Sequence, residues 1–148
     1  MILLMKKIKI FLDCNVLIAG LASTKGASAV ILRLIEADVF EIYISQQVLE
    51  EAERNLKKKL PEFLSYYFYV IKYLPITIIQ DFKKKNVKLT KLFPKRSDQT
   101  IFQTAQKLQP DYFLTLNRKH FHQVPIRKIA TFKIRTPAQF LDEWPKPV

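Results

Sequence analysis

The stretch IKIFLDCNVLI, residues 8–18, decides the fold that we expect for this chain. Its first five residues are apolar except for Lys9, which is typical of a strand buried on both faces. Asp13 and Asn15 follow this strand at once, and apolar positions from Val16 to Leu21 then favour a short helix. A strand that passes directly into a helix indicates the alternating α/β class.

The alternation of strands and helices continues to the end of the chain. We predict strands at 40–44, 76–79, 112–115 and 128–134, and helices beginning near Ala27, Ser45, Pro61, Ser97 or Asp98, and Pro137. The basic segment 82–96 contains Pro94 and gives no clear pattern. We therefore predict a single domain over residues 1–148, an α/β fold built as a three-layer α/β/α sandwich around a central, mainly parallel sheet.

Composition excludes several classes of protein. The 148 residues are 49% hydrophobic, which is enough for a buried core. Glycine occurs only at positions 20 and 26, so neither a P-loop nor a Gly-rich dinucleotide turn can form. Cys14 is the single cysteine, which rules out an internal disulfide and suggests a reducing compartment. The apolar start is short and no stretch resembles a membrane span, so we expect a cytoplasmic protein with no membrane association.

Positive charge is concentrated in the middle of the chain. The net charge is +12, and residues 54–96 contain twelve Lys or Arg against two acids. Such a block favours binding of a phosphate backbone, although a solvated Lys-rich surface is the simpler alternative. The candidates for contact with RNA are Lys57, Lys58, Lys83, Lys84, Lys85, Lys95, Arg96 and Arg118.

Polar side chains are expected where strands end or helices begin. Asp13 follows the first strand, and Asn117 comes just after the strand at 112–115. In a parallel sheet these positions share the carboxyl edge, where such folds bind ligands. Glu51 lies early in the helix expected after Ser45. Asp98 lies at the start of the helix expected after the basic segment 82–96.

Each of these residues also has a plainer interpretation. Asp13 and Asp98 could simply cap helices, and Asn117 could be a turn residue. Glu51 could be a solvated acid, with Glu50 as the competing choice for an inward position. Taken together, however, clustered oxygen ligands suit Mg²⁺ or Mn²⁺, and a basic rim beside them suggests metal-assisted phosphodiester hydrolysis.

Two other chemistries fit the sequence poorly. His120 and His122 have no further Cys or His near them in sequence, which argues against a zinc site. Cys14 has no evident His partner, which argues against a cysteine nucleophile.

Five segments resemble, in order, the motifs of PIN domains. They are FLDCNVLI (11–18), ISQQVLEE (44–51), SDQTI (97–101), DYFLTLNRKHF (111–121) and TPAQFL (136–141). The resemblance covers nearly the whole chain. It implies a parallel sheet between helices and a Mg²⁺- or Mn²⁺-dependent endoribonuclease. Many members are VapC-like toxins neutralised by a cognate antitoxin, and the family often forms dimers.

The resemblance also implies roles for individual residues. Asp13, Glu51 and Asp98 would hold the metal, Asn15 would orient Asp13, and Thr115 would line the site. The fourth position, often Asp in the family, is Asn117 here; an amide can still ligate but carries no charge, which puts a second metal in doubt. Two alternatives follow: a catalytically weakened PIN-fold module that binds RNA or a partner, and a housekeeping RNA-processing nuclease with no antitoxin.

The aromatic run from Phe63 to Tyr73 exceeds what one helix face can bury. We expect an inward face formed by Phe63, Tyr66, Tyr67, Val70 and Leu74. The remaining aromatic side chains favour a protein interface over the stacking of RNA bases.

Overall fold

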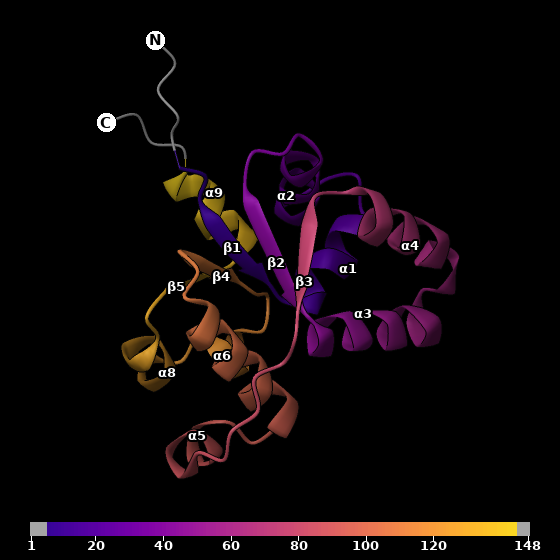
Figure 1. Ribbon diagram of the computed structural model, residues 1–148. Helices are drawn as coiled ribbons and strands as arrows, with labels where there is room; N and C mark the ends of the chain where they lie inside the picture. The colour runs from indigo at the N-terminus through magenta and orange to yellow at the C-terminus, as the bar shows by residue number, and fades with distance from the viewer. Residues whose placement is uncertain (1–5, 145–148) are drawn as a thin grey trace.

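The computed structural model describes residues 6–144 and has a five-stranded sheet at its centre (Figure 1). Every strand pair is parallel, and the order is β3-β2-β1-β4-β5. The strands are β1 (Lys9–Leu12), β2 (Glu41–Ser45), β3 (Ile76–Ile79), β4 (Tyr112–Leu114) and β5 (Lys133–Arg135). The predicted α/β fold with a central parallel sheet is confirmed.

Helices cover both faces of this sheet. They are α1 (Cys14–Ala22), α2 (Ala27–Glu36), α3 (Gln46–Lys59), α4 (Leu64–Tyr73), α5 (Val87–Leu92), α6 (Arg96–Leu108), α7 (Arg118–Phe121), α8 (Val124–Ile129) and α9 (Pro137–Glu143), with a 3-10 turn at Pro61–Phe63. The helices α1 to α4 lie to one side of the sheet and α6 and α8 to the other (Figure 1). This division follows from right-handed crossovers, because the chain moves outward from β1 first in one direction and then in the other.

Strand β1 occupies the middle of the sheet and the centre of the core. Ile10, Phe11 and Leu12 are completely buried. On the side of α6, Phe11 packs edge-on against Phe113, and Phe113 packs edge-on against Phe121, with ring centroids 5.4 and 5.0 Å apart. Aromatic pairs of this geometry stabilise a core beyond the area that they bury. The core packing therefore holds the carboxyl end of β1, which Asp13 follows directly.

The last predicted strand is in part a helix. Residues Val124–Ile129 form α8, and the strand β5 covers only Lys133–Arg135. Pro125 lies in the first turn of α8, where proline is well tolerated, and Ile126 turns into the core. The prediction of a strand over 128–134 was wrong at its start, because alternating Ile and basic residues fit one turn of helix as well as a strand.

The helix before β4 begins earlier than predicted. It starts at Arg96 with Lys95 as its N-cap residue, so the prediction that Ser97 or Asp98 caps it was wrong. Asp98 lies inside the first turn, where a negative charge is favoured by the helix dipole. Residues Val87–Leu92 form α5, which the sequence pattern did not reveal, and the Asn86 side chain caps it.

Helix α4 buries a narrower face than predicted. Tyr67 and Val70 are buried, whereas Tyr66 is 44% exposed and its predicted inward position was wrong. No single helix in the described part of the chain is long and apolar enough to span a membrane, although α1 and α2, bent by 94°, pass that test as a pair by length and composition.

Candidate metal-binding active site

Asp13 stands at the junction of β1 and α1 and is held by three elements of structure. Its Oδ1 accepts a hydrogen bond of 2.8 Å from the backbone N–H of Cys14, which caps α1. Its Oδ2 accepts one of 2.7 Å from the hydroxyl of Thr115, just beyond β4. The plainer interpretation of Asp13, that it caps the helix after it, is therefore confirmed, and the same carboxylate lies at the strand edge.

Burial governs the electrostatics of this carboxyl group. Asp13 is only 3% exposed, and burial raises its pKa to about 6, while the bonds from Thr115 and Cys14 lower it. Among residues 6–144, no Lys, Arg or His forms a salt bridge with Asp13. A buried carboxylate without a cationic partner is unfavourable. The residue therefore has the electrostatic demand that a bound cation would satisfy.

Asn15 ties the loop after β4 to the start of α1. Its Oδ1 accepts a hydrogen bond of 3.0 Å from the N–H of Leu116, and its Nδ2 lies 3.4 Å from Asp13 Oδ2. Thr115 Oγ1 accepts in turn from the N–H of Asn117, at 3.0 Å. These bonds fix the two strand ends relative to each other, so the position of the Asp13 carboxylate is set before any ligand binds.

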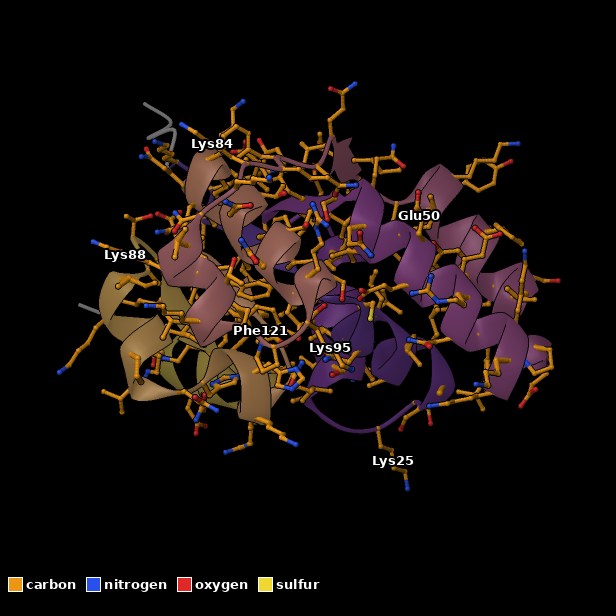
Figure 2. The ribbon with its side chains drawn as sticks, turned by 90° about the horizontal axis from the view of Figure 1, so that it is seen from below. Lys25, Glu50, Lys84, Lys88, Lys95 and Phe121 are labelled. Atoms are coloured by element: carbon orange, nitrogen blue, oxygen red, sulfur yellow. The ribbon has the colours of Figure 1, made fainter. Side chains whose placement is uncertain are left out.

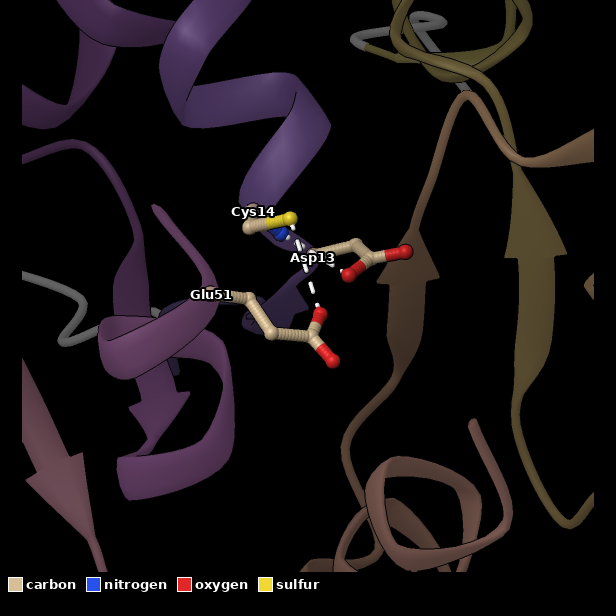
Figure 3. Close-up of side chains that lie close together, drawn as sticks. All are labelled: Asp13, Cys14 and Glu51. Carbon is tan, nitrogen blue, oxygen red and sulfur yellow. Dashed lines mark hydrogen bonds between the residues drawn. The ribbon is translucent and has the colours of Figure 1, made fainter. Parts of the chain in front are cut away.

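Glu51 reaches the same place from α3. The helix begins after Ser45, whose buried hydroxyl accepts from Val48 N–H at 3.2 Å. Gln47 donates to Glu51 Oε1 at 3.2 Å. Glu51 points toward Asp13, and one ligand atom each of Asp13, Cys14 and Glu51 lie within 4.8 Å of one another (Figure 3). The adjacent Glu50 is exposed instead.

Cys14 is the unexpected member of this group. Its Sγ lies 3.7 Å from Glu51 Oε2 and donates to it (Figure 3). Burial, with the charges of Asp13 and Glu51, raises the pKa of the Cys14 thiol far above its usual range. The thiol therefore stays protonated at neutral pH in the metal-free protein, which is the opposite of what a nucleophile needs.

Asp98 is buried in the first turn of α6 and makes a contact that the sequence pattern did not reveal. Its Oδ2 lies 2.6 Å from Nδ1 of His120, in α7, and the contact becomes an ion pair when the imidazole is protonated. Burial raises the pKa of Asp98, while His120 and then Lys95 oppose this. The sequence offers one signal for this contact, a His shortly after Asn117. Only the tertiary structure brings that His to Asp98.

Asn117 serves α7 in this structure. Its Oδ1 accepts from the N–H of His120 at 3.2 Å, and its Nδ2 lies 3.2 Å from His120 Nδ1. It is an N-cap residue, as well as the turn residue that its position suggested. Asn117 therefore supports the His120 ring beside Asp98.

The candidate RNA-binding side chains lie on several elements, and two of them, Lys84 and Lys95, are labelled in Figure 2, which views the molecule from below. Lys83, Lys84, Lys85 and Arg96 line a cavity of about 490 Å³ between α5 and α6. Lys57 and Lys58 lie on the exposed side of α3, where Lys57 pairs with Glu53 at 3.0 Å. Lys95 precedes α6 beside Asp98, and Arg118 lines a separate cavity next to α8.

The profile of the PIN domain family matches residues 9–119, so the chain belongs to the PIN-domain family. The fold is similar to a chain of DNA-bound VapBC from Salmonella typhimurium, with a TM-score of 0.62 and 16% identity, covering 88% of this chain and 98% of that one. A chain of VapBC2 from Rickettsia felis, bound to a promoter DNA fragment, gives a TM-score of 0.58 and 18% identity, covering 86% of this chain and 97% of that one. No curated protein matches the sequence.

Proposed function

We propose that this protein is a metal-dependent endoribonuclease that hydrolyses RNA phosphodiester bonds. The observation that carries the proposal is the meeting of two carboxylates, Asp13 and Glu51, at the carboxyl edge of the sheet with no cationic side chain paired to either among the described residues. Membership of the PIN-domain family, whose members generally bind divalent metals, supports it.

The residues present fit a hard divalent cation, Mg²⁺ or Mn²⁺. Asp13 and Glu51 would hold it, and Asp98 would join them from α6. When bound, such a cation supplies Lewis-acid polarisation of a phosphate. Because the donors are oxygen-rich and Asp13 is buried without a counter-charge, the site meets the chemical demand of the ion.

The protein's own groups then divide the remaining work. Thr115 and Asn15 hold Asp13 in one orientation. Asp98 accepts the proton of the attacking water, and the adjacent His120 stabilises the carboxylate form of Asp98 in the resting site. The basic side chains around this edge hold the RNA backbone.

We further propose a protein partner of the antitoxin kind, which makes this nuclease the toxin of a toxin–antitoxin pair. The support is that both solved structures named above are VapBC complexes. A small protein encoded beside this gene should co-purify with it and inhibit cleavage. If no such protein exists, the housekeeping RNA-processing nuclease replaces the toxin.

Cleavage of a structured RNA by purified protein, with Mn²⁺ or with EDTA, tests the nuclease activity. We expect Asp13→Asn to abolish cleavage, because it removes the buried charge that attracts the metal. Glu50→Gln is the matched control, since Glu50 is exposed beside Glu51 and should leave activity unchanged. Equal activity in Asp13→Asn and wild type would exclude the proposed site.

A catalytically weakened binding module is the second candidate, and the capping role of Asn117 favours it. In this candidate the position that often carries the fourth acid supports α7 instead. Titration with Mn²⁺ separates the two candidates. Absence of binding at millimolar Mn²⁺, together with retained RNA binding, would favour the inert module.

A further inference from the structure

We propose that a groove bounded by α7, α8, β5 and α9 binds the phosphate backbone of the RNA strand next to the scissile bond; this inference rests on the proposed nuclease function. The arginine groove, as we name it, has a volume of about 500 Å³, and its charged or titratable lining residues are Arg118, His122, Arg127, Arg135 and Glu143. Three guanidinium groups in one concavity match the chemistry of phosphodiester anions.

The three arginines line the groove together with His122. Burial lowers the pKa of the His122 imidazole, and the charges of Arg118, Arg127 and Arg135 lower it further. Glu143 is the one acid lining the groove, and it pairs with Arg135. With His122 neutral, the groove therefore keeps an excess of positive charge, which an anion would relieve.

The groove begins directly beside the candidate active site. His122 Nε2 lies 2.9 Å from the backbone oxygen of Thr115, while the hydroxyl of the same Thr115 bonds to Asp13. A phosphate in the groove would thus lie a short way along the strand from a phosphate at Asp13. The link runs through the single residue Thr115, just beyond β4, which bonds to both sides.

The positive surface continues away from the site along the sheet. Strand β5 is one of the two edge strands of the sheet. A neighbouring cavity of about 400 Å³ shares Arg127 and Arg135 with the arginine groove and adds Lys128 and Lys133. A continuous line of cations along one edge fits an extended polyanion better than a single small anion. The occupant we infer is therefore single-stranded RNA.

Binding of a fluorescein-labelled single-stranded RNA in EDTA, measured over a range of salt concentrations, tests this groove. The test variant is Arg118→Gln with Arg127→Gln; both side chains are exposed, and in residues 6–144 neither makes a hydrogen bond or a salt bridge. Loss of two phosphate contacts should reduce the slope of log affinity against log salt by about 1.4 and weaken binding about tenfold.

Two further variants sharpen the experiment. Arg33→Gln, on the exposed side of α2, removes one arginine charge away from the groove and should leave the salt slope unchanged. Glu143→Gln removes the counter-charge of Arg135 and should tighten RNA binding, by about threefold.

The outcomes separate this inference from the proposed function. The assay contains no metal and no turnover, so an inactive protein whose RNA binding depends on the arginines supports the groove and refutes only the nuclease. A double variant that binds RNA with the wild-type salt slope overturns the groove, even if the protein cleaves RNA.

Discussion

At the scale of the residue, two hydrogen bonds stabilise the Asp13 carboxylate while its burial destabilises it. It caps α1, accepts the Thr115 hydroxyl and lies buried at the point where a metal would be held. Its raised pKa shows that the cost of burial exceeds what these two bonds return. Functional sites are often maintained at such a cost, because the unfavourable group is what binds the ligand.

We expect Asp13→Asn to stabilise the metal-free protein at pH 7. A folded pKa of about 6, against an ordinary value of 3.8, corresponds to about 3 kcal/mol of destabilisation when the group is ionised. Because the folded state binds the proton more tightly, the wild type gains stability as pH falls from 6 toward 4, and the advantage of the variant disappears below pH 4. Urea unfolding in EDTA at pH 7 and at pH 4 measures the free energy of unfolding of both proteins. A variant that is less stable than the wild type at pH 7 would contradict the prediction.

Thr115→Val tests the support of Asp13. The variant keeps the shape of the side chain but removes the hydroxyl donor of a buried Asp13 oxygen and leaves it only the longer contact from Asn15 Nδ2, which should cost about 1–3 kcal/mol in the free energy of unfolding. Loss of this donor should also raise the pKa of Asp13 further and weaken Mn²⁺ binding. Thr77→Val, at an exposed position of β3, is the control and should change neither quantity.

At the scale of the element, short helices rather than strands complete the site. Helix α7 has only four residues and begins with Asn117 as its cap. Its one turn carries His120 to Asp98 and Phe121 into the core. A helix this short has little stability of its own, so its position depends on the cap and on the buried Phe121.

Asn117→Asp and Asn117→Ala should separate capping from ligation. Asp caps as well as Asn does, so stability should be retained, whereas Ala should cost about 1 kcal/mol. The added carboxylate should also tighten Mn²⁺ binding, since it restores the charge that is often present at this position. Thermal unfolding and calorimetric titration measure the two effects. An Ala variant of wild-type stability would refute the capping role.

At the scale of the whole molecule, one helix presents an aromatic surface with no partner in the described chain. Tyr67 and Val70 bury the inner side of α4, while Phe68, Tyr69 and Tyr73 are about half exposed or more. An exposed aromatic surface of this kind is typical of a protein interface. It is the surface on which the expected homodimer can be tested.

We expect the double variant Tyr69→Ser with Tyr73→Ser to shift the protein from dimer to monomer. The centroids of the two rings lie 5.1 Å apart on the surface of α4. Their loss therefore removes apolar contact area and spares the core. Sedimentation velocity measures the change. A variant whose sedimentation coefficient equals that of a wild-type dimer would move the interface to another face.

The sequence by itself determined the class of fold and the edge of the sheet at which the candidate site lies. The apolar run of β1 and the polar residues directly after it place Asp13 at the carboxyl edge, because strand and helix periodicities are local properties. Local patterns left Glu51 in competition with Glu50 and Asp98 as a possible helix cap, and the resemblance to PIN-domain motifs singled out both residues as candidates. The local patterns failed where two structures fit one pattern, as in α8, and at the start of α6, where the cap-type residues Ser97 and Asp98 follow an N-cap residue, Lys95, that makes no side-chain cap bond.

Only the tertiary structure decided which side chains meet. Cys14 beside Glu51 and His120 beside Asp98 come from elements that are not consecutive in the chain, and the three arginines come from the successive elements α7, α8 and β5. Their proximity depends on the order of the strands and on the packing of short helices, which no local period encodes. The shift in the Asp13 pKa has the same origin, since desolvation is produced by everything packed around a residue rather than by its neighbours in the chain.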